Sequence, residues 1–173
     1  VFTQIIPTVL FNFSDENFEE NLIKQIRSLE SYFGDILYRS YIGDENCYDD
    51  IELISNEVMP KRMKIVIDCG YIPQASYKSV AEKCTVRISN MKKIISFPCD
   101  YIVASTSFPN NVSELGGDNH DTFSITEIEL HDSVSAKHPE VIYADYGSIN
   151  PIRNDTVVMA RGWIPRIDVP LAR

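Results

Sequence analysis

The sequence lacks most of the short motifs that would identify a function directly. Its four cysteines form no C-x-x-C pair, and it contains no G-x-G-x-x-G pattern, no P-loop and no G-x-S-x-G turn. These absences leave a zinc site, a disulfide framework, a motif-bound nucleotide and a nucleophile elbow without support. We therefore expect buried, reduced thiols and no cofactor.

Runs of basic residues and of apolar residues are also short. No basic run exceeds a pair such as Lys92-Lys93, and the net charge is −9, from 25 acidic and 16 basic side chains. Because binding to phosphate backbones needs a basic face, autonomous nucleic-acid binding is disfavoured. No apolar run approaches a membrane span, so we expect a cytoplasmic protein without membrane contact. An acidic surface suits either simple solubility or contact with a basic partner protein.

What the sequence does contain is an alternation of apolar runs and helical periods. The apolar runs predict strands near residues 8–13, 36–42, 63–68, 101–105, 141–145 and 156–161. Helical spacing predicts helices over residues 18–33, 49–58, 77–95 and 125–136, the first of them capped by Ser14. The connections are long enough for parallel crossovers, but these strands are too few for a complete eight-stranded barrel. We expect an α/β fold with a mainly parallel sheet and alternating helices, forming part of a TIM-barrel-like fold.

The length suits a single α/β domain over residues 1–173. The chain begins at Val1 and stops at Arg173 in the middle of a pattern, and we interpret it as an excerpt of a longer protein that lacks N-terminal and C-terminal parts. We expect such an excerpt to expose apolar surface or to cover it with another copy, which leaves a homo-oligomer open.

Polar residues follow three of the predicted strands where each strand ends. They are Asp68, then Ser105 with Ser107, and finally Asp145 with Tyr146. The run Val141–Ala144 is so continuously apolar that we expect a strand buried on both faces. Tyr146 and Gly147 turn the backbone after it, which would aim Asp145 into the mouth of the sheet. Functional groups of α/β proteins gather at the carboxyl ends of parallel strands, so this edge is the predicted site.

Four short motifs follow one another along the chain: IVIDCG at 65–70, IVASTSFP at 102–109, TEIEL at 126–130, and YADYG at 143–147 with Pro151. Between Pro7 and Pro151 they resemble the Beta protein family of bacteria, prophages and phage satellites. The resemblance implies a barrel-like α/β fold and membership of mobile-element cassettes associated with phage defence or toxin suppression. It implies no reaction. The chain departs from the family at Ile125, Ile128 and Asn150, where arginine, an aromatic residue and histidine are common.

The candidate catalytic residues are the acids Asp68, Glu127 and Asp145. Together they could hold Mg²⁺ or Mn²⁺, with Asp68 and Asp145 as the first ligands, or two of them could divide acid and base roles. Alternatively, strand-end acids cap helices and pair with Arg39, and there is no metal site. The candidate substrate-binding residues are Arg39, Ser105, Ser107 and Tyr146.

Two functional hypotheses follow, and whether the protein is an enzyme stays open between them. The preferred one is a regulatory or immunity-type, toxin-suppressing component of a mobile-element phage-defence cassette. It would act through contact with a protein partner such as a toxin or another defence component. The alternative is a metal-assisted hydrolase of phosphate esters that uses Asp68, Glu127 and Asp145.

Overall fold

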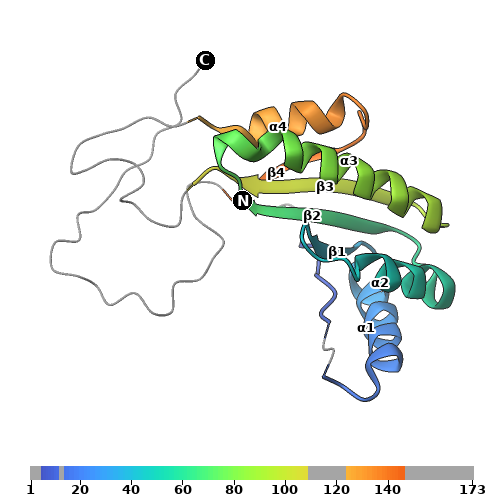
Figure 1. The fold of residues 1–173 in the computed structure, drawn as a ribbon. Helices are drawn as coiled ribbons and strands as arrows, with labels where there is room; N and C mark the ends of the chain where they lie inside the picture. The colour runs from blue at the N-terminus through green and yellow to red at the C-terminus, as the bar shows by residue number, and fades with distance from the viewer. Residues whose placement is uncertain (1–4, 12–13, 109–123, 147–173) are drawn as a thin grey trace, which may run out of the picture.

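The computed structural model describes residues 5–11, 14–108 and 124–146, in which strands and helices alternate around a parallel sheet (Figure 1). The strands lie side by side in chain order, each parallel to the next: β1 (Ile36–Tyr41), β2 (Met63–Tyr71), β3 (Cys99–Thr106) and β4 (Ile142–Asp145). The helices are α1 (Phe18–Phe33), α2 (Cys47–Leu53), α3 (Tyr77–Ile94) and α4 (Thr126–Ser135), with short turns η1 (Ile54–Val58) and η2 (Gln74–Ser76).

The α/β class and the parallel pairing of β2 with β3 confirm the prediction from apolar runs and helical spacing. Within the described residues the sheet does not close into a barrel, because no described strand joins β1 to β4. The strand expected over residues 156–161 lies outside the described part of the chain. None of the described helices combines the length and the apolar character that crossing a bilayer requires.

The helices that follow the strands pack against one face of the sheet, where β1 presents Tyr38 and Ser40. The Tyr38 hydroxyl donates to Asp50 of α2 (2.9 Å), and Ser40 accepts from Arg87 of α3 (2.8 Å). At the other edge, the ring of Tyr143 in β4 meets His131 of α4 edge to face, with centroids 5.6 Å apart. Because successive side chains of a strand alternate between faces, these contacts mark one covered face. We call it the helix face (Figure 1).

The opposite face carries no described helix, and we call it the open face. Burial alternates along β1, where Ile36, Tyr38 and Ser40 are buried and the residues between them are not. Apart from the buried Ala104, the apolar side chains on the open face are only partly covered, and Ile142 remains 43% exposed. By register and alternation this face carries Leu37, Arg39, Tyr41, Lys64, Val66, Asp68, Ile102, Ala104, Ile142 and Ala144.

β4 differs from the prediction made for it. We expected Val141–Ala144 to be buried on both faces, but Ile142 and Tyr143 are exposed and β4 pairs only with β3 among the described strands. The prediction is wrong because an apolar run does not reveal whether a further element covers the strand. Asp145, at the end of this edge strand, is exposed as well.

The strand expected over residues 8–13 is reduced, in its described part, to one parallel bridge between Thr8 and Leu37. Further along, the amide of Leu10 donates to the Gln25 side chain of α1 (2.7 Å) instead of to a strand. The predicted cap at Ser14 is also wrong. Helix α1 begins at Phe18, after a turn in which the Asp15 carboxylate accepts from the Asn17 amide (2.9 Å).

Candidate functional site

Asp68 of β2 lies on the open face, where donors surround its carboxylate. The residue is 1% exposed. Its Oδ2 accepts from Arg39 Nε (2.7 Å), from Arg39 Nη2 and from the Tyr146 hydroxyl, while its Oδ1 accepts from the Gly70 amide (2.9 Å). A buried carboxylate requires such donors, because desolvating it without them is costly. Asp68 is therefore fully engaged in holding its neighbours.

The local structure of three strands brings this group together. Arg39 of β1 pairs with Val66, so Asp68 comes two residues later along the neighbouring strand and on the same face. Beyond Asp68 the register of β2 shifts, and Gly70 adopts a positive φ of 60°, which lets its amide turn back to the carboxylate. Tyr146 follows β4 directly and reaches the same carboxylate from the other side.

Arg39 keeps unused donors. Its Nε and Nη2 are occupied by Asp68 and by the Tyr146 hydroxyl (2.8 Å from Nη2), but within the described residues Nη1 has no partner. The side chain is 37% exposed, and its Cζ lies 4.8 Å from the centre of the Tyr41 ring. Partial burial opposes the charge, but the hydrogen bond and charge of Asp68 outweigh it and raise the pKa of Arg39. The result is a fixed guanidinium with two N–H groups available.

Glu127 lies at the start of α4, on the helix face. The residue is 5% exposed, and its Oε1 accepts from the Ser107 amide (2.6 Å) just beyond β3. Its other oxygen, Oε2, is buried and has no hydrogen-bond partner among the described residues. The predicted Ser107 thus takes part through its backbone, while Ser105 is buried within β3.

Asp145 lies on the other side of the sheet from Asp68. In register, Asp68 pairs with Ala104 and Ala104 with Ala144, so Asp145 is one residue past this row and faces the helices. The prediction that Asp145 points into a buried mouth is therefore wrong. It is exposed and accepts from the Tyr143 hydroxyl (2.6 Å).

The candidate residues consequently form two sets. The open-face set contains Arg39, Asp68 and Tyr146, and the helix-face set contains Ser105, Ser107, Glu127, Tyr143 and Asp145. The structure does not bring the three predicted acids into one cluster, and within the described residues no three metal-ligating side chains could hold an ion. Sequence reasoning missed Tyr143, although its spacing of two from Asp145 in a predicted strand places both on one face.

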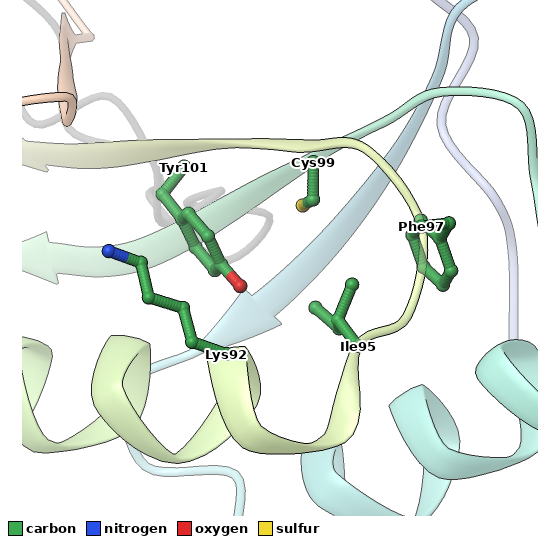
Figure 2. Close-up of a pocket in the computed structure, with 5 residues that line it drawn as sticks. All are labelled: Lys92, Ile95, Phe97, Cys99 and Tyr101. Atoms are coloured by element: carbon green, nitrogen blue, oxygen red, sulfur yellow. The ribbon is translucent and has the colours of Figure 1, made fainter.

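A hollow of about 180 Å³ lies at the amino end of β3, away from both sets (Figure 2). Figure 2 shows that its lining comes from the end of α3 and the start of β3. Lys92 there is paired with Glu140, and burial raises the pKa of the Cys99 thiol to about 12. A protonated thiol is a poor nucleophile, so the hollow offers no activated group. Its lining residues are Lys92, Ile95, Phe97, Cys99 and Tyr101.

Comparison with known proteins assigns the family. Residues 43–173 match the family model described as Beta protein. The chain belongs to the Beta protein family. The match includes Asp68, Glu127 and Asp145, whereas Arg39 precedes it. No curated protein and no solved structure matches this member of the family.

Proposed function

We propose that this Beta family protein is a regulatory, immunity-type component that acts by contacting another protein, with Arg39 as the anchor of the contact. The observation that supports this function is the saturation of Asp68, whose two oxygens already accept from Arg39, Tyr146 and Gly70. Asp68, which the sequence marked as a candidate catalytic acid, instead holds the Arg39 guanidinium in place. Arg39 still has N–H donors available to a partner.

The geometry supports the hydrolase alternative less than it supports a protein contact. A general base or a metal ligand needs a lone pair directed at the reacting group, and those of Asp68 are directed at its own neighbours. Asp145 lies on the opposite face of the sheet from Asp68, which does not favour a site in which the two acids share one ion or one water. We therefore do not propose a reaction.

The chemistry of Arg39 indicates what the partner supplies. The two N–H groups that remain both belong to Nη1, and each can donate to an oxygen of a carboxylate. The partner in this proposal presents an acidic side chain or its C-terminal carboxylate to the carboxyl end of β1. The family's association with mobile-element cassettes makes a toxin or another defence component of the same cassette the partner, met in the cytoplasm.

We also propose that the sheet is part of a barrel-like fold. The strands follow one another in chain order and keep their helices on one face, as in a barrel of alternating strands and helices. A structure of the full-length protein in which further strands extend this order would support the proposal. One in which β1 and β4 both remain edges would refute it.

A capture experiment with a matched control tests the contact. Full-length protein carrying a tag is co-expressed with the neighbouring genes of its cassette, and the amount of each neighbour that co-purifies is measured. Arg39→Lys keeps a positive charge beside Asp68 but removes the Nη1 donors. Arg62→Lys makes the same change in an arginine that pairs with Asp100 (2.9 Å) just before β2, at the other end of the sheet.

We expect Arg39→Lys to reduce the captured partner by roughly tenfold, as truncation of an anchor residue does at protein interfaces. Arg62→Lys should leave capture unchanged. Equal capture by the two variants, at equal amounts of folded protein, would show that Arg39 is not the anchor.

A further inference from the structure

We propose that Glu127 forms a binding site for an organic cation, an ammonium or a guanidinium group, at the carboxyl ends of β3 and β4. The site lies on the helix face, so it is separate from Arg39 and does not depend on the proposed protein contact. Its ligand class follows from the chemistry of the carboxylate and of the groups around it.

The first argument is the unpartnered oxygen of Glu127. The residue is 5% exposed, and only its Oε1 has a donor, the Ser107 amide at 2.6 Å. Oε2 is buried and has no partner among the described residues. A buried acceptor left without a donor loses its hydration and gains nothing in return. A ligand that brings an N–H group with a positive charge restores both the hydrogen bond and the charge balance.

The second argument is the charge around this oxygen. Burial and the hydrogen bond to Asp145 raise the pKa of the Tyr143 phenol, and the charges of Asp145 and Glu127 raise it further. Both carboxylates therefore act on the same phenol, which donates to Asp145 and not to Glu127. Two acids beside an aromatic ring attract a cation. Tyr143 is 39% exposed, so this edge of the proposed site borders on solvent.

The third argument is that the start of α4 is held in place beside the ends of the strands. The hydroxyl of the preceding Thr126 donates to the carbonyl of Ile72 (3.0 Å), and the Ile72 amide donates to the carbonyl of Thr106 (2.8 Å). These bonds tie the first turn of α4 to the ends of β2 and β3. With the Ser107 amide bonded to Oε1, the carboxylate is held before any ligand arrives, which lowers the entropic cost of binding.

The small number of oxygen ligands at the site also favours an organic cation over a metal ion. Mg²⁺ and Ca²⁺ take six or more oxygen ligands, usually with several carboxylates. Within the part of the chain that the structure describes, no three acidic, histidine or cysteine side chains gather in that way. A single N–H donor needs only one lone pair, which is what Glu127 Oε2 offers.

Amide NMR spectra of the full-length ¹⁵N-labelled protein test the site. The probes are butylammonium chloride and methylguanidinium chloride, with N-butylacetamide as the neutral analogue and sodium chloride at matched ionic strength. The Ser107 amide is the reporter because it is bonded to the other oxygen of the same carboxylate. Short peptides with a single lysine or arginine form a second arm, which tells a protein side chain from a free cation.

We expect a saturable shift of the Ser107 resonance with either cation, and no shift with the neutral analogue or with sodium chloride. Glu127→Gln should weaken the response by at least roughly tenfold, because a charge-assisted hydrogen bond is lost. Glu129→Gln removes the same charge from the same helix and should keep the response, as should Arg39→Lys. If Glu127→Gln fails to fold, the comparison of butylammonium with its neutral analogue on the unaltered protein decides.

A Ser107 resonance that does not saturate with either cation would overturn the proposal. It would mean that a proton or a water molecule satisfies Oε2. An equal response in the Glu127→Gln protein would overturn it as well, since the cation would then bind elsewhere. Neither result would bear on the Arg39 contact, whose test is the capture of a cassette partner.

Discussion

Asp68 and Arg39 form an ion pair in which the carboxylate is buried and the guanidinium reaches solvent. The side chain of Asp68 is 1% exposed and that of Arg39 is 37% exposed, and Nε of Arg39 lies 2.7 Å from Oδ2 of Asp68. Because the donors around the carboxylate hold it in place, the pair fixes the direction in which the guanidinium points. This difference in exposure favours a positioning role for Asp68 over a catalytic one.

Replacing Asp68 should cost stability. Asp68→Asn removes the charge that three donor groups of Arg39 and Tyr146 share, and it sets an amide N–H₂ against them. We expect a loss of about 3–5 kcal/mol in the free energy of unfolding, measured by urea titration, as when one partner of a buried pair is removed. Asp145→Asn, at an exposed carboxylate, should cost less than about 1 kcal/mol. Equal stability of the two variants would show that Asp68 is not held as described.

Removing Arg87 should loosen the turn after β1. This buried arginine of α3 donates to the carbonyls of Tyr41, Ile42 (3.1 Å) and Asp44 (2.7 Å), so its loss leaves partly buried acceptors without donors. Arg87→Met, which keeps the apolar stem, should cost about 3 kcal/mol or more in a urea titration. Faster hydrogen exchange of amides in residues 42–46 should accompany it. Unchanged exchange there would contradict the role assigned to Arg87.

The core should respond as a packed interior. Ile65 is fully buried in the middle of β2, and Ile128 is 38% exposed on α4. We expect Ile65→Ala to cost about 2–5 kcal/mol, from lost burial and the cavity that remains. Ile128→Ala should change the free energy of unfolding by less than about 0.5 kcal/mol. Similar costs for both, measured by chemical denaturation, would mean that the helices do not cover the face on which Ile65 lies.

Stability should fall in alkaline solution. Burial raises the pKa of the Cys99 thiol to about 12, and the neighbouring Cys84 thiol together with burial raises that of Cys69. Between the pKa of an unfolded thiol, about 8.5, and these raised values, the unfolded chain releases protons that the folded chain keeps. The free energy of unfolding therefore decreases as pH rises through this window, and the contribution is complete below it.

Urea midpoints measured at intervals across that window check this behaviour. Cys99→Ala should flatten the decline, because it removes one of the groups that stay protonated only in the folded state. A midpoint that rises with pH over the same interval would contradict the burial of these thiols.

The parallel order of the strands was predictable from the sequence. Met63–Ile67 and Tyr101–Ala104 are mostly apolar runs of strand length, and the helical spacing between them over residues 77–95 leaves room for a parallel crossover. The strands and the helix between them both depend on local residue spacing, so the structure contains both. The helix ends were less predictable: α2 gives way to the π-helical turn η1, and Met59 ends it with a positive φ of 49°.

The arrangement of the candidate site was not predictable in the same way. Which face Asp68 and Asp145 occupy depends on the register across β3, and a shift of one residue would exchange the faces. The sequence of β4 likewise does not indicate whether another element of the chain buries this strand. Arg39 could be named as a partner of strand-end acids, but only the structure shows that it pairs with Asp68.

The decisive measurement is the survival of cells that carry the complete cassette, with full-length protein bearing Arg39→Lys compared with Arg62→Lys at equal cellular abundance. If Arg39 anchors the contact, Arg39→Lys loses toxin suppression or defence, while its thermal midpoint stays within a few degrees of the unaltered protein because the charge beside Asp68 is kept. Arg62→Lys should protect as well as the unaltered protein. Full protection by Arg39→Lys would contradict the proposal that this protein acts through a contact anchored at Arg39.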